Sequence, residues 1–204
     1  MSGGVSDQNK VKLTVKTGHP FSLDGVLAPL SKTGNGVVFP YSPTIQISHA
    51  ANYGNFDITH GMYPSNYYIN TPNPTISLTA LFTCNTEADT AYSAAALQFF
   101  KACTKSDFGE QRRATAGTPP PILNFSAYGT IHSKLTPVVV SSFGYTLTED
   151  VDYVEVDAGP AGIVTMPTQW LASLELSVQF PPSSVRKDFN LKDYASGNLL
   201  KGYL

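Results

Sequence analysis

Histidine and cysteine are the residue types in this chain with the widest range of chemistry, and their spacing decides whether they can form a site. Metal sites built on histidine usually place two of them three or four residues apart or beside cysteines, and no HxxxH or HExxH pattern occurs here. The four histidines are scattered at His19, His49, His60 and His132. The sequence therefore predicts no metal site.

The two cysteines, Cys84 and Cys103, form no CxxC motif. If the segment between them is helical, they lie more than about 20 Å apart along it, which is beyond the reach of a disulfide. We expect two free, reduced thiols.

The usual signatures of catalysis and of phosphate binding are missing. A catalytic serine of the GxSxG type would sit on a turn between a strand and a helix, and no such motif occurs. The glycine-rich stretch "SKTGNGVVF" precedes a strand, whereas a phosphate-binding loop opens a helix. We interpret it as a hairpin turn with Asn35 and Gly36 at its corner. No catalytic or cofactor-binding residues are predicted, and we expect a protein that is not an enzyme.

An acidic run, "EDVDYVEVD", begins at Glu149. It lacks the glycine and the terminal glutamate that a calcium-binding EF-hand loop needs. One interpretation is a solvated strand and turn. The other is that its carboxylates, repeated around a ring, form a negative surface that keeps DNA from adhering. The candidate lumen-facing acids are Asp150, Asp152, Glu155 and Asp157.

Composition indicates a folded protein that buries surface against partners. The chain has 204 residues, which suits one domain spanning 1–204, and 42% of them are hydrophobic. Only 14% are charged, against about 25% in typical soluble domains. A formal net charge of −2 disfavours a nucleic-acid-binding footprint, which needs clustered lysine and arginine. No apolar run is long enough for a membrane helix, and no signal peptide is apparent, so we expect a cytoplasmic product with no membrane insertion.

The alternation of apolar and polar residues predicts a mainly β fold. A phase slip at Ser141 and Ser142 predicts a β-bulge. Three prolines, Pro119 to Pro121, would form a stiff lead-in to the strand after them and guard a sheet edge, because proline donates no backbone hydrogen bond. The predicted strands lie in 11–16, 43–48, 74–82, 122–129, 138–148 and 171–180.

One segment has the spacing of an amphipathic helix, at about 86–106. Thr86 followed by Glu87 and Asp89 resembles a capping box, and apolar residues then recur at intervals of three and four. This helix must cover the sheet, because no other apolar surface is available to it.

Two segments carry candidate interface residues. The stretch between Ser48 and Pro74 sets aromatic residues among Asn, Gly and Pro; these rings either pack under a loop or contact a neighbouring subunit. Residues 183–204, like the N-terminus, read as an extended arm that docks on an adjacent subunit. The candidates in the two segments are Tyr53, Phe56, Tyr63, Tyr67 and Tyr68, then Phe189, Leu191, Leu199 and Leu200.

Several spaced stretches, in order, resemble one known family. "GVVFPYSPTIQISHAANY", "TKSDFG", "GTPPPILNFSAYG", "LTEDVDYV" and "FNLKDYASGNLL" are similar to the tail-tube-like baseplate proteins of contractile-tailed bacteriophages, often described as tube initiators. The likeness runs from about Val37 to Leu200.

This resemblance implies an antiparallel β-sandwich or barrel of tail-tube type with one flanking helix. It implies a virion protein that forms a homo-hexameric ring at the junction of baseplate and tail tube. The strands at 74–82, 138–148 and 171–180 would then contribute to one large barrel around a channel through which DNA passes. Adjacent baseplate and tail-tube ring proteins are the expected partners, with tape-measure and sheath proteins as further candidates.

The alternative from a different functional class is a receptor- or carbohydrate-binding β-sandwich. In that case exposed Tyr63, Tyr67, Tyr68 and Trp170 would serve as stacking platforms.

Overall fold

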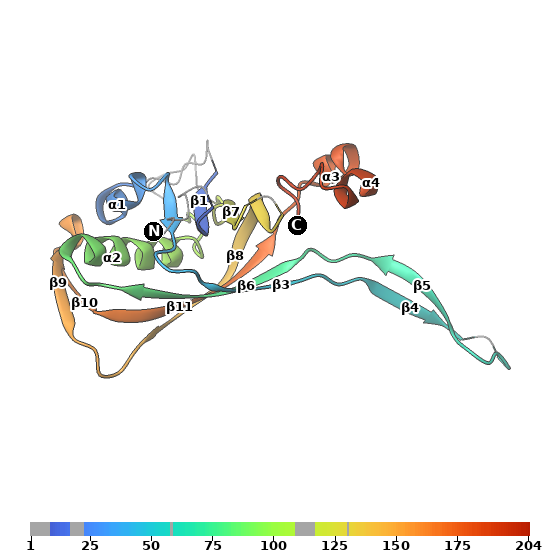
Figure 1. Ribbon diagram of the computed structural model, residues 1–204, viewed down its shortest axis with the longest axis horizontal. Helices are drawn as coiled ribbons and strands as arrows, with labels where there is room; N and C mark the ends of the chain where they lie inside the picture. Colours follow the sequence, from blue (N-terminus) through green and yellow to red (C-terminus); the bar gives the residue numbers. More distant parts are fainter. Residues whose placement is uncertain (1–8, 17–22, 58, 109–116, 130) are drawn as a thin grey trace, which may run out of the picture.

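The computed structural model describes residues 9–16, 23–57, 59–108, 117–129 and 131–204. The fold is mainly β, as predicted, and its principal element is a seven-stranded antiparallel sheet with the order β2-β1-β7-β8-β11-β6-β3 (Figure 1). The strands of this sheet are β1 (Lys12–Val15), β2 (Gly36–Val38), β3 (Thr44–Ser48), β6 (Thr75–Thr83), β7 (Leu123–Ala127), β8 (Ser133–Leu147) and β11 (Gln169–Val178). The predicted N-terminal arm and His19 lie outside the described residues.

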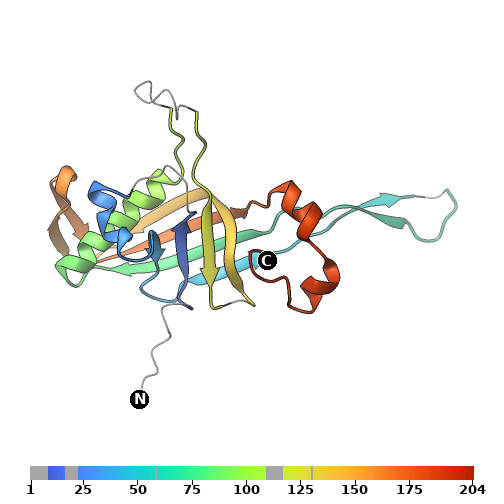
Figure 2. The same ribbon diagram turned by 90° about the horizontal axis from the view of Figure 1, so that it is seen from above.

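Strand β8 is long and belongs to two layers of the sheet. Its first half pairs with β7 as far as Val138, and its second half pairs with β11 alone among the described strands. Seen from above, β1, β7 and the start of β8 run across the direction of β6 and β11 (Figure 2). We call the layer formed by β3, β6, β11 and residues 141–147 of β8 the wall.

The predicted bulge lies where β8 passes between the two layers. Glu175 of β11 faces Ser142 while the next residue, Leu176, faces Val140, so Ser141 is the extra residue. The Ser141 hydroxyl donates a hydrogen bond to the Glu175 carbonyl oxygen at 2.8 Å, which supplies a partner for a backbone group at the irregularity. Bulges bend and twist a strand, so this one explains how β8 serves both layers.

Helix α2 (Glu87–Ala102) packs on the wall, as its apolar spacing predicts (Figure 1). Thr86 caps its start, because the Thr86 hydroxyl accepts a hydrogen bond from the Asp89 amide at 3.2 Å. Phe99 and Phe100 of α2 are fully buried against the sheet. Below them the rings of Phe82 and Trp170 stack with centroids 4.6 Å apart, and the Trp170 Nε1–H donates to the Ser93 hydroxyl at 2.6 Å.

Smaller elements surround the sheet. A 3₁₀ turn η1 (Gly25–Leu27) and helix α1 (Ala28–Ser31) lead into β2. A hairpin of β9 (Tyr153–Asp157) and β10 (Ile163–Pro167), whose two strands are connected by a 3₁₀ turn η3 (Gly159–Ala161), packs beside α2. A second hairpin, β4 (Asn52–Phe56) with β5 (Ser65–Asn70), continues from β3 and β6 and projects far from the body (Figures 1 and 2).

Three details of the sequence prediction are wrong. Helix α2 ends at Ala102, not at about 106, and the Thr104 hydroxyl donates a hydrogen bond to the Lys101 carbonyl oxygen. The turn at Gly34 and Asn35, both with positive φ, joins α1 to β2 and is not a hairpin corner. The three prolines precede β7, an interior strand between β1 and β8, so they guard no edge. Among the described residues, no strand pairs back onto β2 or β3, so the sheet ends at these two strands.

The predicted extended C-terminal arm is helical. It contains α3 (Pro182–Asp188) and α4 (Leu191–Ala195), and an aromatic cluster folds it back on the body. The Phe180 and Tyr203 rings stack at 5.1 Å, and Phe189 lies 5.7 Å from Tyr203. The Gly202 amide also donates to the Lys134 carbonyl oxygen of β8 at 2.8 Å, so the chain end is tied to the sheet.

The buried Trp170 contact gives a direct test of how α2 is held on the wall. Changing Ser93 to Ala leaves the buried indole N–H without its acceptor, and we expect the free energy of unfolding to fall by about 1–3 kcal/mol. Trp170 is the only tryptophan, so its fluorescence during urea unfolding reports this site. The control, Ser173→Ala on the exposed face of β11, should change stability by less than about 0.5 kcal/mol. Equal effects of the two changes would contradict the assignment.

Candidate assembly surfaces

The two faces of the wall differ in chemistry because side chains alternate along each strand. The face toward α2 carries buried apolar residues such as Leu78, Leu174 and Trp170. No helix or strand of the described chain lies over the opposite face (Figure 1). We call that uncovered side the open face.

The open face is made mostly of hydroxyl and amide side chains. Register and alternation place on it Thr44, Gln46 and Ser48 of β3; Thr75, Ser77, Thr79, Leu81 and Thr83 of β6; Gln169, Leu171, Ser173, Glu175 and Ser177 of β11; and Ser142, Gly144 and Thr146 of β8. Glu175 is the single charged residue in these four strand segments, all of which are described. A sheet surface with this composition hydrogen-bonds water readily yet offers little fixed charge.

The composition of this surface is visible in the sequence. The apolar positions of each wall strand predict the core, and the residues between them are Ser, Thr and Gln far more often than Lys or Glu. What the sequence alone could not supply was the strand order that gathers these residues on one side.

The β2 edge of the sheet is closed by a side chain of α2. At the β2 edge, Tyr92 of α2 reaches Val38: the Val38 amide donates to the Tyr92 hydroxyl at 2.7 Å, and that hydroxyl donates to the Val38 carbonyl oxygen at 2.8 Å. Burial raises the pKa of Tyr92, and its hydrogen bond to the Val38 backbone opposes the shift. The β2 edge is therefore capped from within the chain.

The aromatic candidates of the projecting hairpin lie on its two faces. Tyr53 and Tyr68 face each other across the ladder, with ring centroids 5.9 Å apart. On the other face, the Tyr67 ring crosses Gly54, where an added Cβ would lie 2.5 Å from it, and Phe56 and Ile69 flank this pair by alternation. Tyr63, near the hairpin tip, is 80% exposed. The rings do not pack under a loop of the described chain, which removes one of the two interpretations of this segment.

The C-terminal candidates have different environments. Leu191 is 70% exposed and Phe189 is 41% exposed, whereas Leu199 and Leu200 are half-buried. Their role at an interface stays a prediction.

The four candidate acids lie at one end of the wall. Asp150 and Asp152 are exposed in the turn after β8, and Glu155 and Asp157 are exposed on β9, on the side away from the buried Val156. None of them is on the open face of the four wall strands. Their assignment to a lumen stays a prediction, and the charge that the wall itself presents is Glu175, which the sequence interpretation did not single out.

One residue of the alternative hypothesis, a receptor- or carbohydrate-binding module, cannot act as a stacking platform. Trp170 has no exposed surface, because it stacks on Phe82 beneath α2. It is therefore unavailable to a sugar ring, and the sequence interpretation of Trp170 is wrong.

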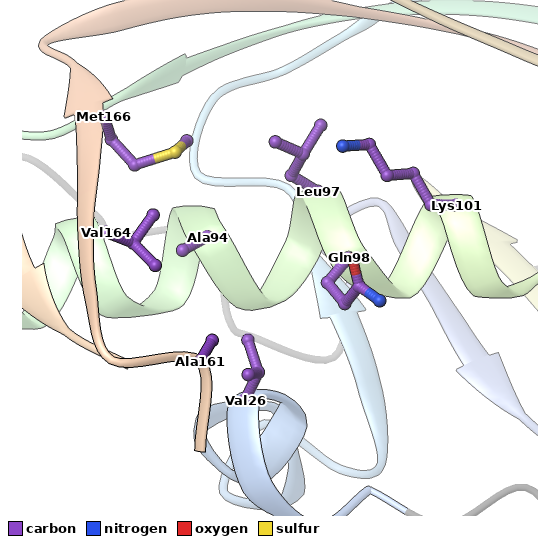
Figure 3. A pocket seen from close by; sticks show the side chains of 8 residues that line it. All are labelled: Val26, Ala94, Leu97, Gln98, Lys101, Ala161, Val164 and Met166. Carbon is purple, nitrogen blue, oxygen red and sulfur yellow. The ribbon is translucent and has the colours of Figure 1, made fainter. Parts of the chain in front are cut away.

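A pocket of about 290 Å³ lies between α2, η1 and β10 (Figure 3). Its lining is mostly aliphatic, including Leu97, Val164 and Met166, and its polar side chains are Gln98 and Lys101. The Lys101 ammonium also lies 5.0 Å from the centre of the Tyr145 ring, a cation–π contact. This set contains no nucleophile paired with a base.

Two searches bear on metal and membrane binding. Within the described residues, no three or more His, Cys, Asp or Glu side chains come together as a potential metal site. None of the helices in that part of the chain combines the length and the apolar character that crossing a membrane requires.

Both cysteines are buried and unpaired with each other, as predicted. Burial raises the pKa of Cys103, which has no exposed surface. Burial likewise raises the pKa of Cys84, against the opposing effect of hydrogen bonds to Ser93 and Thr90. The native thiols are therefore protonated at neutral pH and shielded from reagents.

These pKa shifts predict that stability falls in alkaline solution. In the unfolded chain a thiol ionises at about pH 8.5, while folded Cys103 keeps its proton. The contribution of this thiol to the free energy of unfolding is therefore fully present below that pH and is lost as the pH rises above it. The slope should reach about 1.4 kcal/mol per pH unit for each thiol. Urea unfolding of the wild type and of Cys103→Ala at pH 7.5 and 9.5 measures it, and the variant should lose less stability over this interval. An identical loss in both proteins would refute the assignment.

Comparisons with known proteins give matches among solved structures. No protein-family model and no curated protein matches the chain. Among solved structures, the fold is similar to a chain from the tail of an empty gene transfer agent particle with C6 symmetry, at 10% identity and a TM-score of 0.38, over 87% of this chain and 95% of that one.

Proposed function

We propose that this protein is a structural virion protein that forms a homo-hexameric ring at the junction of baseplate and tail tube and nucleates or extends the tube. The observation that carries the proposal is the wall: an antiparallel layer with one apolar face covered by α2 and an uncovered face of hydroxyl and amide groups. Such a layer suits the lining of a water-filled channel, where the covered face supplies stability and the open face meets solvent.

The number six rests on the sequence resemblance, and the wall is consistent with it. Six copies of a four-stranded wall would give a barrel of about 24 strands, beyond the roughly 16 strands at which closed barrels leave an aqueous channel. The low charge of the open face suits passage of DNA, because tight phosphate binding requires clustered Lys and Arg. DNA would be a passing cargo and not a ligand.

The projecting hairpin supplies the contact between successive rings in this proposal. A two-stranded hairpin is at best marginally stable in water by itself, and this one exposes Phe56, Tyr67 and Ile69 on one face. Covering those side chains with the next layer, a further ring or an adjacent baseplate or tail-tube protein, would stabilise both. The C-terminal segment, with exposed Leu191, lies on the side of the body from which the hairpin projects and is a second candidate for this contact (Figure 1).

The lumen acids and the remaining partners complete the proposal. Asp150, Asp152, Glu155 and Asp157, repeated six times, would make one end of the ring negative and repel phosphate. Tape-measure and sheath proteins are further partners, and the site of action is the tail of the virion after assembly in the host cytoplasm.

Ring formation is tested with the purified full chain. We expect native mass spectrometry to show a six-subunit species, alone or with a tail-tube partner, and negative-stain images to show rings with a central pore. A protein that stays monomeric at high concentration with its tube partner present would overturn the proposed function.

The hairpin contact is tested separately by changing its apolar face. Phe56→Ser with Ile69→Ser should leave rings intact but prevent their stacking, since each loses about 1.5–3 kcal/mol of burial at the contact and six copies act together. Asn55→Ser with Asn66→Ser, on the opposite face, is the matched control. Sedimentation velocity distinguishes single rings from stacks. Normal stacking by the Phe56 and Ile69 variant would place the ring-to-ring contact elsewhere.

A further inference from the structure

The C-terminal segment, residues 181–204, contacts the sheet through its last four residues. Lys201 forms a parallel β-bridge with Lys134 of β8, and the Gly202 amide donates to the Lys134 carbonyl oxygen at 2.8 Å. No side chain between 181 and 204 is buried, and α3 and α4 lie outside the two layers of the sheet (Figures 1 and 2). The chain end is therefore seated on the sheet while the residues before it add nothing to the core.

The edge that receives the chain end is made by a second bulge in β8. The register between β7 and β8 shifts here, so that Lys134 and Leu135 together face Ser126. Leu135 has a φ of 57°, in the left-handed region that leucine rarely adopts, and its amide donates to the Ser126 hydroxyl at 3.0 Å. Such backbone states persist only where the surrounding structure fixes them, and they concentrate at functional sites. Because a bulge takes one residue out of the ladder, it presents Lys134 to an incoming strand.

Two side chains complete the contact. The Tyr203 ring stacks on Phe180 with centroids 5.1 Å apart, and half-buried Leu204 packs against the hydrophobic core. Pairing of a short extended segment with a sheet edge, reinforced by neighbouring side chains, is the mode of recognition called β-strand addition. We call Lys134, Phe180 and the core surface beneath Leu204 the C-terminal seat.

The connection to the body allows the chain end to reach further than its own seat. Pro181 and Pro182 follow Phe180, and Pro181 is extended, with φ −61° and ψ 128°. Consecutive prolines stiffen this exit and prevent the strand from continuing. Residues 181–200, if extended at about 3.3 Å per residue, would span roughly 65 Å, well beyond the radius of gyration of about 17 Å expected for a domain of 204 residues.

The folded-back arrangement also leaves apolar side chains uncovered. Val185, Phe189 and Leu191 are exposed, although they belong to a segment that returns to its own body. A segment that crossed to a neighbouring copy would bring these side chains to a protein surface that can cover them, which favours the crossed arrangement in an assembly.

From these features we infer that the C-terminal seat is an exchange site. In the isolated chain it holds the chain's own residues 201–204, and in the assembled protein it holds residues 201–204 of a second copy. Each contact of the seat can form between copies exactly as it forms within one, so the exchange sacrifices none of them. This inference rests on the proposed function and names the acceptor for the contact that the C-terminal segment makes there.

The experiment is disulfide cross-linking of the full chain carrying both Lys134→Cys and Lys201→Cys. The two residues are partners in the β-bridge and are exposed, so a disulfide between them reports an occupied seat and the fold should tolerate both changes. The native cysteines are buried. With a mild oxidant such as copper phenanthroline, dilute monomer should give a link within one chain. Under conditions in which rings form, the same protein should give a ladder of covalent multimers.

Single variants and a matched control identify the linked residues. Lys134→Cys mixed with isotopically heavy Lys201→Cys should give a dimer of one light and one heavy chain under ring-forming conditions. Lys134→Cys with Lys187→Cys, which moves the second thiol to an exposed lysine of α3 outside the bridge, should cross-link about tenfold less, because disulfides need closely spaced Cα atoms.

The outcomes separate the exchange from the proposed function. Links that stay within one chain in assembled rings would overturn the exchange and leave the ring function standing. A dimer from Lys201→Cys alone would mean that two chain ends meet each other, and would also overturn it. No link in either state would overturn the seat. Covalent multimers without six-subunit rings would support the exchange and contradict the proposed hexamer.

Discussion

The structure depends on the contact between α2 and one face of the wall. Because side chains alternate along strands, burying one set under Phe99, Phe100 and the Phe82–Trp170 stack leaves the other set on the opposite face. An isolated antiparallel layer of this size would be unstable without such a cover, and the helix provides it on one side only. The chemistry of the open face is thus free to serve something other than folding, and its residues are hydroxyls and amides.

The bulge at Ser141 is the second determinant, because it decides which edges of the sheet stay open. A straight β8 would stay in one layer along its whole length. Bending it lets the first half pair with β7 and close the core with β1 and β2, while the second half departs from β7 and keeps an edge. The same chain caps its short β2 edge with Tyr92. One strand therefore links the layer whose β2 edge is capped to the layer whose outer edges pair with no strand of the described chain.

Much of this could be predicted from the sequence, and the gaps have physical reasons. Alternation located most strands of the main sheet, the break in alternation located the bulge, and the capping pattern at Thr86 located the start of α2. Errors arose where local pattern gives no long-range information. The sequence around Trp170 does not distinguish an exposed ring from a buried one, and only the strand pairing places Trp170 under α2. The three prolines are compatible with an edge strand, and only the pairing of β1 with β7 shows that β7 is an interior strand. The C-terminal helices are short, and the clustering of Phe180, Phe189 and Tyr203 that holds them is not periodic.

The fold shows which surfaces of the chain carry few charged residues. In a solvated monomer, few charges would usually mean poor solubility, since charged side chains keep copies apart. Here the four wall strands contribute one carboxylate, Glu175, and the projecting hairpin strands contribute no charge at all. These are the surfaces that would be enclosed in a ring or covered by a neighbour, whereas the segments outside them, such as the acidic turn after β8 and helix α3, carry ordinary charge densities. Charge is scarce on the surfaces where copies would approach one another in the proposed ring, and this distribution agrees with that proposal.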